Sequence, residues 1–231
     1  MKYITHWLLP VITLFIIAYL RLQDGYLTEV VRLNSFDYLQ STDPVVQSKD
    51  VIIVELDESA VEQYGQWPWP RDVLADIVWK LREQGAGIIV MPILFSEPDS
   101  HGMDMTFIEN IAGNGVVIAQ VGTTQTNRNA VSRGVAKIGD PIPWLFEWPG
   151  MLGPIELLGI NADGVGVINI APEIDGVVRR MPTIMRVGEE TYPAMAVETI
   201  RVAMGAPSYQ IKADDTGIVA VRVPGYPIIN T

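Results

Sequence analysis

Residues 51–99, VIIVELDESAVEQYGQWPWPRDVLADIVWKLREQGAGIIVMPILFSEPD, decide the fold. The β-branched apolar run at residues 51–56 has the length of a buried strand. Residues 71–84 predict a helix, because apolar residues recur at the i, i+3, i+4 and i+7 spacing of one helix face: Leu74, Ile77, Val78 and Leu81. Residues 87–91 supply a second buried strand. A strand, a helix and a strand in this order predict a parallel βαβ unit with a right-handed crossover.

Polar residues follow both predicted strands. Asp57 comes after the first strand, Arg71 opens the helix, and Glu97 and Asp99 come shortly after the second strand. The carboxyl ends of parallel strands meet at one rim of a sheet, where ligands of open α/β sheets usually bind. We therefore expect Asp57, Arg71, Glu97 and Asp99 to form a ligand-binding site. Arg71 has two roles open to it: clamping an anionic ligand, or pairing with a nearby acid of the protein itself.

The same stretch resembles the opening of the type-two CHASE domain, an extracytoplasmic sensory domain found with bacterial cyclases and histidine kinases. Its IDE-S, G-x-WPWPR, helix-ending GA and FDxLFxEPD segments correspond here to residues 56–59, 65–71, 85–86 and 91–99. This chain has Pro92 where the family usually has Asp. If that Asp helps to build a ligand site in the family, the site is altered here.

A later run, GVGVINIAPEIDGVVRRMP at residues 164–182, resembles a second segment of the family, D-x-DG-x-x-R-R. Glu173 stands at the first acidic position, and the other four positions match: Asp175, Gly176, Arg179 and Arg180. Asp-Gly between the apolar runs at 165–170 and 177–187 also predicts a hairpin turn. Of the two arginines, we expect one to pair inward and the other to be solvated, and Arg179 joins the candidate ligand-binding residues.

The predicted fold class is α/β: a mixed sheet with parallel βαβ units and a C-terminal hairpin, preceded by one N-terminal transmembrane helix. A second helix near residues 104–112 and a strand at 115–121 repeat the βαβ pattern. A helix at 193–204 and a strand at 218–223 follow later in the chain. Residues 122–137 are polar and irregular, and we expect them to form an exposed loop.

The N-terminal residues predict a membrane anchor. The apolar run at residues 3–20 is flanked by Lys2 and Arg21, and it is long enough to cross the hydrocarbon core. A cleaved signal peptide is the alternative, but no A-x-A-like cleavage site follows the run. We predict a tail and anchor at residues 1–21, a connector helix at 22–48, and a type-two CHASE sensory domain, incomplete at its C-terminal end, at 49–231.

The resemblance implies a single-pass protein of the bacterial inner membrane with its main domain outside the cytoplasm. It also implies no catalysis by this chain, with an adenylate or guanylate cyclase or a kinase as an output domain beyond residue 231. The expected partners are an unknown small-molecule ligand, the membrane, and a second copy or a signalling protein. Two other functions stay open: an extracytoplasmic hydrolase using Asp57 and Glu97, and a non-catalytic assembly protein.

Composition excludes several classes of function. A net charge of −11 over 231 residues argues against a nucleic-acid partner, whose phosphates require a basic surface. The absence of cysteine excludes disulfides and zinc–thiolate sites, and two histidines make a histidine-rich metal site or a Ser–His–acid triad a poor match. No phosphate-binding glycine motif is present. We therefore predict no catalytic residue, no metal site and no cofactor.

Overall fold

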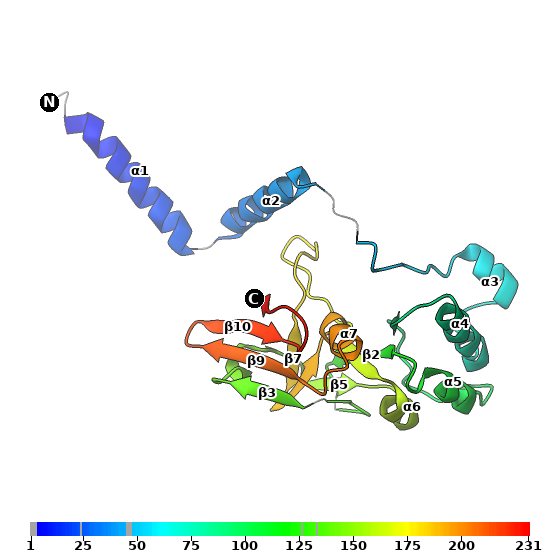
Figure 1. Ribbon diagram of the computed structural model, residues 1–231. Helices are drawn as coiled ribbons and strands as arrows, with labels where there is room; N and C mark the ends of the chain where they lie inside the picture. The colour runs from blue at the N-terminus through cyan, green and yellow to red at the C-terminus, as the bar shows by residue number, and fades with distance from the viewer. Residues whose placement is uncertain (1–3, 24, 45–47, 126, 133) are drawn as a thin grey trace. The chain divides into compact units, whose positions relative to one another are not determined.

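The computed structural model describes residues 4–23, 25–44, 48–125, 127–132 and 134–231 (Figure 1). The chain divides into two compact units. The first consists of Met1–Glu55 together with Pro172–Arg179, and the second consists of Leu56–Ala171 together with Arg180–Thr231. The candidate ligand-binding residues fall in both units, because Arg179 belongs to the first and the other four belong to the second.

The first unit contains two helices, α1 (Ile4–Gln23) and α2 (Tyr26–Thr42). Apolar side chains on α1 are exposed, with exposed fractions of 66% for Leu9 and 69% for Phe15. Within the described residues, no helix combines the length and the apolarity required of a membrane span. The helix predicted in the connector at residues 22–48 is present as α2.

The second unit is built around strand β2 (Val116–Thr123), which is buried over its first five residues. Parallel strands flank it: β1 (Ile89–Met91) and β6 (Gly164–Val167). Strand β5 (Gly150–Leu152) pairs with the end of β2 in the antiparallel direction. Helix α5 (Asp104–Ile111) connects β1 to β2, so a parallel βαβ unit is confirmed for this part of the chain.

In the described part of the chain, two further sheets belong to the second unit. One has the order β11–β10–β9–β3 and contains an antiparallel hairpin near the C-terminus, and the other has the order β4–β7–β8. The mixture of parallel and antiparallel pairs confirms the α/β class, although the strands of the described residues form three sheets instead of one. Their bounds are β3 (Val135–Ile138), β4 (Phe146–Glu147), β7 (Ile184–Val187), β8 (Glu190–Pro193), β9 (Tyr209–Asp214), β10 (Gly217–Arg222) and β11 (Ile229–Asn230).

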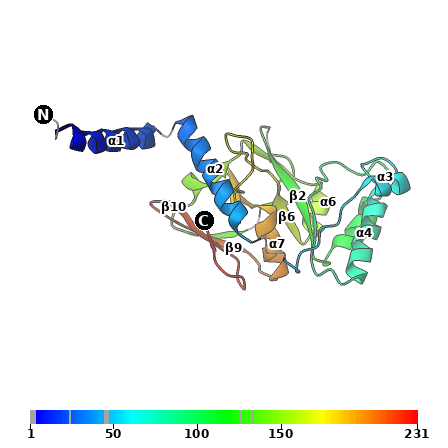
Figure 2. The same ribbon diagram turned by 90° about the horizontal axis from the view of Figure 1, so that it is seen from above.

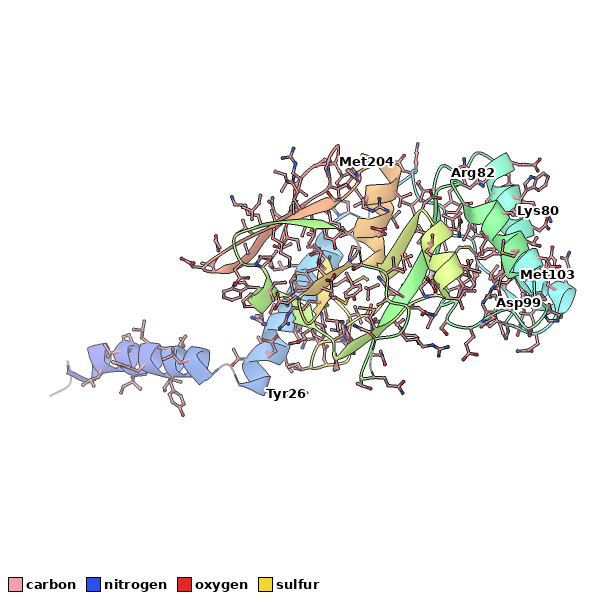
Figure 3. The ribbon with its side chains drawn as sticks, turned by 90° about the horizontal axis from the view of Figure 1, so that it is seen from below. Tyr26, Lys80, Arg82, Asp99, Met103 and Met204 are labelled. Carbon is pink, nitrogen blue, oxygen red and sulfur yellow. The ribbon has the colours of Figure 1, made fainter. Side chains whose placement is uncertain are left out.

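Helices cover the central strands. The predicted helix at residues 71–84 is confirmed as α4 (Arg71–Glu83), and its apolar face buries Leu74 and Val78. Helices α4 and α5 pack side by side, as Figures 1 and 3 show. The helix predicted at residues 193–204 is α7 (Met195–Ala203), which packs against β6 and β2 (Figure 2). The remaining helices are α3 (Glu58–Tyr64), α6 (Glu156–Asn161) and the 3₁₀ turn η1 (Ile142–Trp144).

The strand predicted at residues 51–56 is wrong. The structure shows no strand there, and the side chains of Ile52 and Ile53 are 84% and 89% exposed. An apolar run indicates a preference for burial, but a strand also needs a neighbouring strand to accept and donate its backbone hydrogen bonds. The parallel ladder therefore begins at β1.

Two other predictions also need correction. Asp175 and Gly176 do form a turn, because the Glu173 amide donates to the Val177 carbonyl at 3.0 Å, but no hairpin surrounds it. The flanking strands pair elsewhere, β6 with β2 and β7 with β8, so their backbone groups are already satisfied. The loop predicted at residues 122–137 includes the last residues of β2 and most of β3, which gains its order by pairing with β9.

A buried ion pair fixes α7 to the start of β6. Glu198 is fully buried, and its two carboxylate oxygens accept hydrogen bonds from the Nε and Nη2 atoms of Arg201, both at 2.8 Å. Arg201 also donates to the carbonyls of Asp163 and Ala206, and the Glu198 carboxylate accepts from the Val165 amide. These bonds raise the pKa of Arg201, mainly through Glu198. Each charge is therefore compensated inside the protein.

Replacing Arg201 tests this arrangement. Arg201→Ala leaves the Glu198 carboxylate buried without its cation, so we expect the free energy of unfolding to fall by about 3–5 kcal/mol. Urea unfolding measures the change. Arg222→Ala, at an exposed position of β10, is the matched control and should shift stability by less than about 0.5 kcal/mol. Equal stability of the two variants would show that the ion pair contributes little.

Candidate ligand-binding cavity

A cavity of about 550 Å³ lies at the C-terminal end of β1. Three of the predicted site residues line it: Arg71, Glu97 and Asp99. The other lining residues come from the segment before α4 and from the loop after β1, at positions 67–69, 92–94, 96, 98 and 100–101. The cavity therefore occupies the rim expected for ligands in α/β sheets.

The WPWP segment forms one wall of this cavity. The Trp69 ring is 2% exposed, and its Nε1 atom donates to the Gly65 carbonyl at 2.8 Å. The Trp67 ring lies edge-on to Trp69 with 5.6 Å between ring centroids, and Tyr64 contacts Trp69 from 5.3 Å. Pro70 precedes the first residue of α4, where a missing N–H costs the helix nothing. Trp69 thus anchors the segment in the core, while Trp67 remains 39% exposed.

The guanidinium of Arg71 is held by the protein itself. Its Nε atom lies 3.3 Å from Oδ1 of Asp104, its Nη2 atom donates to the Glu97 carbonyl at 3.2 Å, and its Cζ atom lies 4.3 Å from the centroid of the Phe95 ring. The Arg71 side chain is only 11% exposed. Of the two roles open to Arg71, the structure shows the pairing with an acid of the protein.

Asp104 and Asp99 extend this network across the loop. Asp104 accepts the Asp99 amide through Oδ2 at 2.9 Å, and Asp99 accepts the Met103 amide through its own Oδ2 at 3.1 Å. Figure 3 shows Asp99 and Met103 close together at this end of the unit. Asp104 is also the first residue of α5, where a carboxylate interacts favourably with the partial positive charge of the helix N-terminus. Arg71, Asp104 and Asp99 therefore join the starts of α4 and α5 to the cavity loop.

Asp57 does not line the cavity. It is the N-cap of α3, and its Oδ1 atom accepts hydrogen bonds from the Ser59 hydroxyl at 2.7 Å and the Ala60 amide at 3.0 Å. These bonds, led by Ser59, lower the pKa of the Asp57 carboxyl. A hydrolase would need Asp57 and Glu97 in one site, and only Glu97 is on the cavity wall. A ligand-binding role for Asp57 stays a prediction.

Arg179 lies in the first unit and binds acids from two segments of it. Its Nε and Nη2 atoms each lie 2.7 Å from an oxygen of Asp37 on α2, and its Nη1 and Nη2 atoms donate to Asp175 at 2.9 and 2.7 Å. Glu173 is 3.9 Å away, and the Arg179 side chain is 4% exposed. We call Arg179, Asp37 and Asp175 the Arg179 clasp. It joins α2 to the turn at residues 173–177.

The clasp changes the acidity of its members. The hydrogen bonds from Arg179 lower the pKa of Asp37 and, together with the Val177 amide, lower the pKa of Asp175 from 3.8 to about 2. The two carboxylates in turn raise the pKa of Arg179. The prediction that one arginine of the pair turns inward agrees with this geometry.

The sequence did not identify Asp104 and Asp37 as partners of the candidate residues. Asp104 could be recognised only as an acid at the start of a helix, and Asp37 only as one of several charges on α2. Within the described residues, no group of three or more acidic or histidine side chains is arranged to hold a metal ion.

The engagement of Arg71 predicts a cost in stability when it is removed. Arg71→Ala leaves Asp104 without its cation, and we expect the free energy of unfolding to fall by about 1.5–3 kcal/mol, as for a hydrogen bond to a charged group. Urea unfolding of the full chain measures it. Lys80→Ala, at an exposed position on the same helix, should leave stability nearly unchanged. Unchanged stability of Arg71→Ala would instead leave the guanidinium available to a ligand.

The Arg179 clasp predicts a dependence on pH. Because the folded-state pKa values of Asp37 and Asp175 lie below their ordinary values, the clasp stabilises the fold above about pH 4 and loses that effect as pH falls towards 2. Carboxyl-carbon NMR should show Asp175 titrating near pH 2. Arg179→Gln should move that titration upward, and Arg222→Gln should not. An Asp175 pKa that is unchanged in Arg179→Gln would contradict the clasp.

The model of the CHASE2 domain family matches residues 11–229, which is nearly the whole chain. Searches of curated proteins and of solved structures each gave no match. CHASE2 domains are extracytoplasmic sensory domains and are not catalytic. The resemblance in the WPWPR and DG-x-x-R-R segments is therefore confirmed, and the chain belongs to the CHASE2 domain family.

Proposed function

We propose that this chain is the membrane-anchored, extracytoplasmic sensory part of a bacterial signal-transduction receptor of the cyclase or kinase type. Its ligand is a small molecule bound in the cavity at the end of β1. The observation that carries the proposal is the cavity itself. It lies where α/β sheets bind ligands, and three of the residues singled out by their sequence positions line it.

The cavity is connected to the elements that a ligand would have to move. Its walls come from the segment before α4 and from the loop between β1 and α5, and Arg71 bridges the two through Asp104 and the Glu97 carbonyl. A ligand that contacts both walls favours one spacing between them. It produces a signal only to the extent that it binds two arrangements unequally. We propose that the signal reaches a cyclase or kinase output domain outside these 231 residues through the anchor or through a second subunit.

Helix α1 supports the anchoring part of the proposal. It has 20 residues, which at about 1.5 Å each extend for about 30 Å. Exposed apolar side chains continue along it, including Leu14, Phe15 and Ile17 at 61–69% exposure. Burying these side chains in lipid removes apolar surface from water. The N-terminus is then inside the cell, and the acidic domain is outside.

Pro92 bears on which ligands fit. It directly follows β1 and lines the cavity, at the position where the family usually has Asp. A carboxylate there would add a charged acceptor, whereas Pro92 presents a rigid apolar ring and no N–H. We propose that the ligand of this chain differs from the ligands of relatives that keep the Asp.

Topology reporters test the anchoring and the location of the domain. Alkaline phosphatase fused after residue 231 should be active in the periplasm, and green fluorescent protein at the same point should remain dark. Deleting residues 1–23 should move the chain out of the membrane fraction, while deleting a stretch of equal length from α2 and its linker should not. The reverse reporter pattern would contradict an extracytoplasmic domain.

A ligand screen tests the sensory part. Any small molecule that binds the folded chain and not the unfolded chain raises the melting temperature, by an amount that grows with its concentration above Kd. We expect at least one hit whose effect is reduced by substitutions in the cavity wall and unchanged by substitutions on α7. Complete insensitivity to a broad library would favour an assembly protein over a receptor.

A further inference from the structure

We propose that the cavity at the end of β1 binds a small organic cation, an amine or ammonium group attached to a short apolar chain. This inference rests on the proposed function, because it names the ligand class of the same cavity. It differs from the expectation that Arg71 clamps an anion. The argument uses three features of the lining: the engagement of Arg71, the two acids beside it, and the exposed Trp67.

Arg71 is poorly placed to attract an anion. Two of its three guanidinium nitrogens have protein acceptors, Asp104 and the Glu97 carbonyl, and its face lies over the Phe95 ring. Asp104 also offsets its charge. An anionic ligand would have to compete with contacts that the folded chain already makes, and the Arg71 side chain is only 11% exposed.

The remaining charges of the lining are negative. Glu97 is exposed, and among the described residues its carboxylate has no hydrogen-bond or ion-pair partner. Asp99 accepts the Met103 amide through one oxygen and, within the same described part of the chain, has no cationic partner. Because Asp104 offsets the positive charge of Arg71, the carboxylates of Glu97 and Asp99 make the electrostatic potential of the cavity negative. A cation of the ligand is the group that complements it.

The apolar part of the lining suits the same ligand. Trp67 is 39% exposed on the cavity wall, and indole is the aromatic ring that binds cations best. Trp69 and Phe95 are buried in the core next to this wall. Three prolines of the lining, Pro68, Pro92 and Pro98, add apolar surface with little conformational freedom to lose. An exposed indole can bind an ammonium group over its face, and here it lines the same cavity as two carboxylates that have no cationic partner among the described residues.

Three probes of similar size and different charge test the proposal. Choline carries a quaternary ammonium group, 3,3-dimethylbutan-1-ol is its neutral carbon analogue, and 3,3-dimethylbutyrate is an anion of similar size. Isothermal titration calorimetry with the full chain in detergent, at near-physiological salt, measures the affinity for each. We expect choline to bind about fivefold or more tightly than the neutral analogue, and the anion to bind most weakly.

A matched pair of variants separates the cavity from the general acidity of the chain. A protein of net charge −11 attracts any cation, and Glu97→Gln and Glu109→Gln each remove one negative charge. Glu109 is exposed on α5 and does not line the cavity. Glu97→Gln should lower choline affinity by about fivefold, and Glu109→Gln should leave it unchanged. Because both positions are exposed, neither change should impair folding, and thermal unfolding checks that. Trp67→Leu should also weaken choline and spare the neutral analogue.

The contrary outcomes are distinct. Equal binding of choline and its neutral analogue, or equal loss in Glu97→Gln and Glu109→Gln, would overturn the cation class. Tighter binding of the anion would also overturn it and return Arg71 to the ligand-binding role, while the sensory function would stand. Binding of none of the probes at millimolar concentrations would overturn the inference too. The topology reporters and the broad ligand screen would still test the sensory function independently.

Discussion

The backbone pairing of β2 is the constraint on which the second unit depends. Its residues pair with β1 and β6 in parallel and with β5 in the antiparallel direction, and Val116 to Ala119 are completely buried. Gln120, also fully buried, satisfies its side-chain amide with both backbone groups of Val131. Strand β1 has three residues and, in the described part of the chain, pairs with β2 alone. The cavity loop that follows β1 is therefore positioned through β2.

Stability and binding share residues at the cavity. Arg71 contacts the ring of Phe95, which is buried edge-on against Phe107, so the cavity wall and the apolar core meet at one side chain. The network through Asp104 then fixes the loop at two points. The side chains of this network are already ordered by the protein, so a ligand that prefers this arrangement of the walls does not have to order them when it binds. The network uses only the backbone carbonyl of Glu97, so the Glu97 carboxylate stays exposed.

Local patterns predicted the longer helices well, missed the short helices α3 and α6, and predicted the pairing of strands less well. The spacing of Leu74, Ile77, Val78 and Leu81 identifies α4, because helical hydrogen bonds are local and only the buried face must be read from the sequence. The run at residues 51–56 has an equally clear pattern but no strand, since a ladder depends on a partner elsewhere in the chain. The candidate site shows the same difference between local and long-range information. The positions of Arg71, Glu97 and Asp99 after a strand or before a helix placed them at one rim, whereas the 33-residue separation between Arg71 and Asp104 hid their ion pair.

The Arg179 clasp has a consequence for the order of folding. Arg179 and Asp37 are separated by 142 residues, so their contact closes a long loop of chain. The conformational entropy lost on closing a loop rises with the length of the loop. The chain loses this entropy before the new contact can stabilise the fold. Asp175, four residues from Arg179, carries no such cost. We expect Arg179 to bind Asp175 as soon as the turn forms and to bind Asp37 on α2 only after the chain between them has folded. The docking of α2 is then the last step in building the first unit.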